Sequence, residues 1–220
     1  MNYIAHARAY LTRPWMCVGV CIPDFLTGSE RGLRPKKVFP TPVDEQSATL
    51  ARGLKRHISD NAWFHKNSVF KKTQDDIAAL ITEACPGVRA RFFAHIALEI
   101  LLDACLVEED PGVLDRFYET LGSLDPEEVH RKTQPFLNKE SQRLGQTMTR
   151  FLKARFLEGY EDDAQVVQRL QGVAFGVRQR GKGLGRLDES VIDAIGLSRE
   201  IVRHRSDALL TPEGPSPDRY

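Results

Sequence analysis

The segment VRARFFAHIALEILLDACLVEE, residues 88–109, decides the fold class. Apolar side chains lie almost all round a helix drawn through it, which is typical of a helix that runs through a core. The segment ends before Pro111-Gly112, and helical patterns continue on both sides of it. Because no alternating pattern lasts more than a few residues, the sequence predicts an all-α, single-domain helical bundle. We expect the other helices at 4–11, from a start at Thr41-Pro42 past Arg56, and at 75–84, 113–121, 126–136, 139–158, 162–178 and 188–204.

The length of the chain favours one domain. Its 220 residues are enough to bury roughly 70% of the unfolded surface. The segment 28–42 is rich in Gly, Pro and Lys, which predicts a mobile loop. We expect the domain to span residues 1–205, and residues 206–220, with three prolines, to form a disordered tail.

Composition excludes several classes of protein. Lys and Arg number 31 against 30 Asp and Glu, so binding to nucleic acid driven by charge is not expected. The sequence has no apolar run of about 18 residues, which argues against a membrane span. It opens without a basic region followed by an apolar stretch, so we expect a cytoplasmic protein.

Cysteine usage agrees with a reducing compartment. All four cysteines lie in apolar runs, as reduced, buried thiols do. Cys17 and Cys21 have no second pair at metal spacing, which argues against a zinc ribbon. The four cysteines are Cys17, Cys21, Cys85 and Cys105.

Three ionisable residues interrupt the most apolar helix. His95, Glu99 and Asp103 follow one another at intervals of four, so they share one stripe of the helix. Imidazole and carboxylate groups are ligands of divalent metals, and this spacing lets two side chains reach one ion. The alternative is a helix edge that faces solvent, with the two carboxylates in water.

A second helix repeats this geometry. His57, Asn61 and His65 are also four residues apart, and Asp60 lies one turn from His57. These residues are candidate metal ligands with a carboxylate neighbour. The alternative is a polar helix face with two surface histidines.

Two more polar residues stand in apolar surroundings near the start of the chain. His6 follows Ile4 and Ala5, and Asp24 follows an apolar run that ends at Pro23. Each has a structural alternative, His6 as a core histidine with its hydrogen bonds satisfied and Asp24 as a cap. Taken together with the two stripes, they favour a metal centre.

A basic, glycine-rich turn follows the helix expected at 162–178. It contains Arg178, Arg180 and Lys182 and lacks the spacing of a Walker motif. Its cations and exposed amides are suited to a phosphate group. The alternative is a solvated loop between two helices.

These residues together resemble the acyl carrier protein phosphodiesterase family. The opening MNYIAH (1–6), Gly19 with Pro23-Asp24-Phe25, Gly53-x-x-x-His57 and Glu99-x-x-x-Asp103 are similar to motifs of that family, in the same order. The chain departs from the pattern in three places. Asn61 and His65 stand where the family has Asp, and Ala104 stands where it has His.

The resemblance implies an HD-phosphohydrolase-like fold and a metal-dependent phosphodiesterase. A phosphodiester would be its substrate, with acyl carrier protein as the candidate partner, and one or two ions of Mn, Zn, Fe or Mg as cofactor. Asp60 or Asp103 would orient a ligand or act as general base. Arg178, Arg180 and Lys182 would neutralise the phosphate. The implied metal ligands are His6, Asp24, His57, His65, His95 and Glu99.

Two other functions stay open at this stage. The N-terminal His, the Pro-Asp step and His-x-x-x-Glu on a core helix are also similar to zinc-dependent phospholipase C and single-strand nucleases, although Met1 stands in place of their N-terminal Trp. The second alternative is a non-catalytic helical protein that binds metal or a partner, which Asn61 and Ala104 favour.

Overall fold

The computed structural model describes residues 1–30, 32–178 and 183–213. For residues 176–178 it describes the backbone alone. The predicted all-α class is confirmed: within these ranges the one extended pairing is an isolated bridge between Pro35 and Leu137. Contacts divide the chain into two compact units. Unit 1 comprises Met1–Ala62 and Asp110–Phe156, and unit 2 comprises Trp63–Glu109 and Leu157–Tyr220.

Unit 1 is a set of helices around an aromatic core. The rings of Tyr3, Phe25 and Phe151 lie with centroids 4.8–5.7 Å apart, so they join three helices that are distant in sequence. Helix α2 packs on α1, α6 and α8, and α7 packs on α8. The helices are α1 (Tyr3–Ala7), α2 (Pro14–Ser29), α3 (Glu45–Phe64, of which residues 45–62 belong to this unit), α6 (Val113–Gly122), α7 (Pro126–Thr133) and α8 (Leu144–Ala154).

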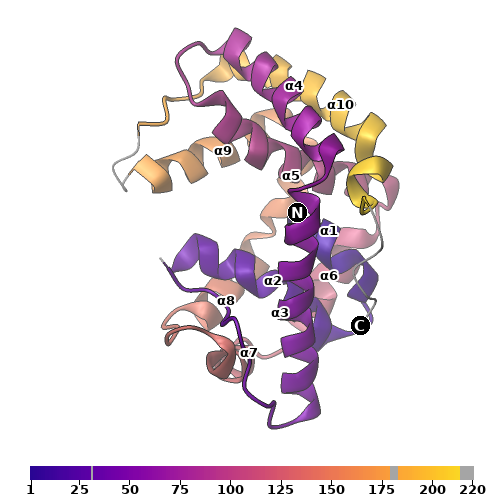
Figure 1. Cartoon of the computed structure of the whole chain (residues 1–220), viewed down its shortest axis with the longest axis vertical. Coiled ribbons are helices and arrows are strands. Elements are labelled where there is room, and N and C mark those ends of the chain that lie inside the picture. Colours follow the sequence, from indigo (N-terminus) through magenta and orange to yellow (C-terminus); the bar gives the residue numbers. More distant parts are fainter. Residues whose placement is uncertain (31, 179–182, 214–220) are drawn as a thin grey trace. The chain divides into compact units, whose positions relative to one another are not determined.

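Unit 2 is built on the helix that the apolar segment predicted. Helix α5 (Ala90–Glu109) buries Phe93, Leu98 and Leu101 completely. It packs against α4 (Ser68–Ala84), α9 (Asp163–Arg178) and α10 (Ile192–Leu210). Figure 1 shows α4 and α10 side by side.

Two helices of unit 2 differ from their predicted bounds. Helix α4 begins seven residues before the expected 75, because the Asn67 side chain accepts a hydrogen bond from the Val69 amide at 2.7 Å and caps it. Helix α10 continues to Leu210, so residues 206–210, expected in the tail, are helical. Ser206 and Leu209 are buried, and the prolines that predicted a tail begin only at Pro212, after the end of the helix.

Two expected helices of unit 1 are shorter in the structure. The one predicted at 126–136 ends as α7 at Thr133 and continues as a 3-10 turn, Gln134–Phe136, because Pro135 lacks the amide hydrogen that an α-helix needs. The one predicted at 139–158 is α8, Leu144–Ala154. It closes where Arg155 adopts a left-handed conformation with φ of 42°.

In unit 1, the largest difference from the predicted structure is that α2 continues through Pro23. The sequence suggested that the apolar run ends there, but the helix extends to Ser29. Proline removes one backbone donor from a helix interior and does not forbid the helix when packing supports it. Phe25 and Leu26, which follow Pro23, are almost completely buried and provide that packing. Asp24 therefore lies on a helix and is not a cap.

Two composition-based expectations are addressed by the described residues. None of the helices in this part of the chain is long and apolar enough to cross a membrane. All four cysteines are buried, and no disulfide joins them.

Candidate metal centres

A close crossing of α2 and α3 sets up the first candidate site. A Cβ atom added at Gly53 would lie 2.7 Å from the Met16 carbonyl oxygen and 2.8 Å from the Gly19 Cα. One added at Gly19 would lie 2.5 Å from the Leu50 carbonyl oxygen. Only glycine allows two helix backbones to approach this closely. The crossing brings the next turn of α3, which carries His57, against α2.

His57 has a defined tautomer in this position. Its Nδ1 donates to the Val20 carbonyl oxygen at 2.7 Å, so Nε2 carries the lone pair. Asn61 Nδ2 donates to Nε2 at 2.9 Å, while Asn61 Oδ1 accepts from the backbone nitrogen of Met1 at 2.8 Å. Asp24 Oδ1 lies 4.0 Å from the same Nε2. The unprotonated nitrogen of His57 therefore accepts from the Asn61 amide and lies near a carboxylate.

His57 is held in the neutral form. Burial, followed by the electrostatic interaction with His6, lowers the pKa of His57 to about 3. The two imidazole rings stack with centroids 4.1 Å apart. A neutral imidazole is the form that binds metals.

Asp60, which we expect to orient a ligand or act as general base, lies next to His6. Its Oδ2 is 3.5 Å from His6 Nδ1, and its Oδ1 forms an ion pair with Arg56, 2.8 Å from Nε. Burial alone would raise the pKa of Asp60, but the interactions with His6 and Arg56 outweigh it and lower that pKa. Asp60 is an ionised carboxylate 96% hidden from solvent, fixed between an imidazole and a guanidinium group.

His6, Asp24 and His57 form what we call the buried cluster. One nitrogen or oxygen from each lies within 4.8 Å of the others. His6 and His57 are nearly inaccessible to solvent, and the side chain of Asp24 is one quarter exposed. Two imidazoles and a carboxylate fit Mn, Fe or Zn, and a backbone carbonyl on the second ring nitrogen is the support that metal-binding histidines usually have.

His65, His95 and Glu99 form the open cluster in unit 2. His65 Nε2 is 2.8 Å from Glu99 Oε1, and His95 Nε2 is 3.5 Å from the same oxygen. The two histidine side chains are about one third exposed, and that of Glu99 is one fifth exposed. Burial alone would raise the pKa of Glu99, but the hydrogen bonds from both imidazoles help to lower it well below its usual range.

The structure thus groups the six predicted ligands as two sets of three, each inside one unit. Asp103, the last residue of the predicted stripe, is completely buried in α5, so the alternative of a wet carboxylate is wrong for it. It contributes no ligand atom to the open cluster. Arg180 and Lys182 lie outside the described residues, and Arg178 ends α9, with no description of its side chain.

Sequence reasoning missed the residues that support the ligands. Arg56 holds Asp60, the Val20 carbonyl fixes the tautomer of His57, and Phe70 lies beside both histidines of the open cluster. The glycines of the crossing were visible as motif positions, but only the structure shows that they meet. A backbone carbonyl gives no signal in sequence, because every residue has one.

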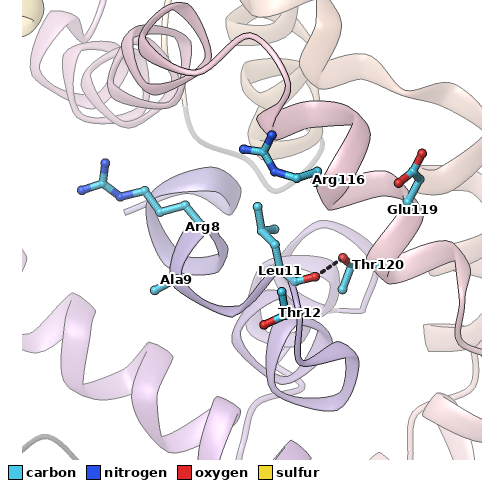
Figure 2. A pocket seen from close by; sticks show the side chains of 7 residues that line it. All are labelled: Arg8, Ala9, Leu11, Thr12, Arg116, Glu119 and Thr120. Atoms are coloured by element: carbon cyan, nitrogen blue, oxygen red, sulfur yellow. Dashed lines mark hydrogen bonds between the residues drawn. The ribbon is translucent and has the colours of Figure 1, made fainter.

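A separate pocket of about 350 Å³ lies in unit 1 between the start of the chain and α6. Figure 2 shows the side chains of Arg8 and Arg116 beside it, and Thr120 donating to the Leu11 carbonyl oxygen at 2.5 Å. Arg116 is already paired with Asp110. None of the predicted site residues lines this pocket, so the two clusters remain the candidate sites.

Comparison with known proteins adds no identification. No protein-family model matches the sequence, and no curated protein or solved structure matches it either.

Proposed function

We propose that the chain is a divalent-metal-dependent phosphodiester hydrolase centred on the buried cluster. The observation that carries the proposal is the fixed tautomer of His57: Nδ1 donates to the Val20 carbonyl, and Nε2, which carries the lone pair, lies 4.0 Å from Asp24 Oδ1. A buried imidazole held neutral beside a carboxylate and a second imidazole is a donor set suited to a divalent ion.

Each residue of this region has a role in the proposal. His6, Asp24 and His57 hold the ion, and Asp60 orients the His6 ring from behind with the support of Arg56. A divalent ion, when bound, supplies a strong nucleophile from water at neutral pH and draws charge from the phosphoryl oxygens. The one-quarter exposure of Asp24 supports it as the edge of the cluster from which substrate approaches.

The finer assignments rest on the family resemblance and on composition. The resemblance supports acyl carrier protein as the first natural substrate to test, and Arg178, Arg180 and Lys182 as the groups that bind its phosphate. Four buried thiols without a disulfide support a reducing, cytoplasmic location.

Hydrolysis of a bis-aryl phosphodiester tests the proposed function. The purified protein is assayed with Mn²⁺, and again after chelation and dialysis. We expect turnover that the chelator removes and Mn²⁺ restores. His57→Gln keeps a polar side chain but removes the imidazole, and it should lower kcat by several orders of magnitude. His204→Gln, a change on the exposed part of α10, is the matched control and should leave kcat unchanged.

A second candidate function is metal binding without catalysis. The observation that favours it is Asn61, whose Nδ2 donates into the His57 lone pair at 2.9 Å. The family that the chain resembles has an Asp at this position. An Asp carboxylate would add a metal ligand, whereas the Asn61 amide occupies the nitrogen that would bind the ion. Titration with Mn²⁺ separates the two functions. Binding at the buried cluster with no hydrolysis by the loaded protein would favour the non-catalytic function and contradict the first proposal.

A further inference from the structure

We propose that the open cluster is a second cation site in its own right. It takes Zn²⁺ or a similar borderline transition metal through His65, His95 and Glu99, and it loads independently of the buried cluster. This goes beyond the proposed hydrolase function, because a complete three-ligand set lies inside unit 2 alone.

The ligand atoms already have the separations of a tetrahedral shell. Zinc–nitrogen and zinc–oxygen bonds of about 2.1 Å place neighbouring ligand atoms about 3.4 Å apart in a tetrahedron. Glu99 Oε1 lies 2.8 Å from His65 Nε2 and 3.5 Å from His95 Nε2, which brackets that value. An ion therefore requires the shorter edge to lengthen by about 0.6 Å and the longer one to change by about 0.1 Å.

The surrounding side chains hold the imidazoles in place. The Phe70 ring lies against both, with centroids 5.2 Å from His65 and 5.3 Å from His95 in edge-to-face arrangements. The Phe64 ring centroid lies 5.6 Å from that of His65. His95 and Glu99 are one turn apart on α5, so their backbone separation is fixed by the helix. The side chains are thus held in place before an ion arrives, and binding replaces the Nε2 protons that hydrogen-bond to Glu99.

The donor chemistry selects the class of metal. Two imidazole nitrogens and one carboxylate favour Zn²⁺ over Mg²⁺ or Ca²⁺, which prefer oxygen ligands and keep more water. Three protein ligands leave one tetrahedral position, and the partial exposure of all three side chains leaves that position to solvent. Such a site exchanges its ion readily.

Counting bound Zn²⁺ by calorimetric titration tests this inference. We expect the whole chain to bind two equivalents. His95→Gln and, as a second variant of almost the same shape, Glu99→Gln should each lose one equivalent, with affinity at that site falling at least 100-fold. His57→Gln should lose the other equivalent and keep the open site. His204→Gln is the control and should bind two.

Three results would overturn the inference. Unchanged Zn²⁺ binding in both His95→Gln and Glu99→Gln means that the open cluster holds no ion. Loss of both equivalents in either variant, with an unchanged circular dichroism spectrum, means that the clusters do not load independently. If the wild type binds one equivalent and His57→Gln loses it, the open cluster likewise holds no ion. None of these readouts depends on hydrolysis, so failure here is distinguishable from failure of the proposed function.

Discussion

The buried cluster and the open cluster have the same composition, two imidazoles and one carboxylate, in opposite surroundings. In the buried cluster the histidine side chains are 0% and 6% exposed, whereas those of the open cluster are 36% and 37% exposed. The ligand separations differ as well. His57 Nε2 is 4.0 Å from Asp24, and His65 Nε2 is 2.8 Å from Glu99.

The comparison separates two properties of a candidate metal site: the burial of its side chains and the spacing of its ligand atoms. The buried cluster has the stronger supports, Val20 behind His57 and Asp60 behind His6, but an ion there must first displace the Asn61 amide. In the open cluster the ligand atoms lie closer together, and their side chains are partly exposed. We therefore expect slow, tight binding at the first and fast exchange at the second.

The largest expected effect separates the two clusters through the helix crossing. Gly53→Ala forces a Cβ against the backbone of α2 at 2.7–2.8 Å, which neither helix can relieve with a side-chain movement. We expect a loss of about 3 kcal/mol in unfolding free energy and loss of Mn²⁺ binding at the buried cluster. Urea denaturation and metal titration measure both.

The matched control for this substitution lies on α2 itself. Gly28 has open space where a Cβ would go, so Gly28→Ala should keep the metal and leave stability unchanged or raise it by about 0.5 kcal/mol. Zn²⁺ binding at the open cluster should survive Gly53→Ala. Equal effects of Gly53→Ala and Gly28→Ala on stability would show that the crossing does not position the cluster.

Metal-linked stability is the next largest effect. An ion that binds only the folded chain adds about 2.7 kcal/mol at 100 times its dissociation constant, which raises Tm by about 5–10 °C for a chain of this size. Mn²⁺ should produce this shift in the wild type and not in His57→Gln. A melting curve that does not change between loaded and chelated protein, with metal content measured in both, would contradict it.

Acid should destabilise the metal-free protein through His57. Because the folded pKa of about 3 lies below the unfolded value of about 6.5, stability is complete above pH 6.5 and falls as the pH drops towards 3. The loss between pH 6.5 and pH 5 is about 2 kcal/mol. Asp60, whose pKa is lowered from an already acidic value, loses its contribution only below about pH 4 and does not affect this window.

Urea denaturation at several pH values checks this dependence. His57→Gln should flatten the profile between pH 6.5 and pH 5 by about 2 kcal/mol, whereas His204→Gln should leave it as in the wild type. Parallel profiles for all three proteins would show that His57 is not buried in its neutral form.

The smallest predicted effect tests the role of Asn61. Asn61→Asp replaces an amide that donates to His57 with a carboxylate that accepts, and adds a negative ligand beside Asp24. We expect Mn²⁺ affinity at the buried cluster to rise about tenfold, or about 1.4 kcal/mol, with no change for Zn²⁺ at the open cluster. Unchanged or weaker Mn²⁺ binding would mean that residue 61 does not face the ion.

Much of the fold could be predicted from the sequence, because apolar periodicity and caps are local signals. Helix α5 is within two residues of its predicted start, and both ends of α6 agree within one residue. The continuation of α2 through Pro23 could not be predicted, since it depends on the burial of Phe25 in a core that the chain makes only when folded. The candidate ligands were visible as polar residues in apolar surroundings. Their division into two sets was not visible. Spacing of four residues shows which side chains share a helix face, but not which other helix packs against that face.

The position of a bound ion tests the central claim most directly. Crystals soaked in Mn²⁺ and measured near the manganese absorption edge would show it as an anomalous difference peak. We predict a peak about 2.2 Å from His57 Nε2, within reach of His6 and Asp24, with the Asn61 amide turned away from the imidazole. A map with no peak at the buried cluster, and with Asn61 still donating to His57, would contradict the account.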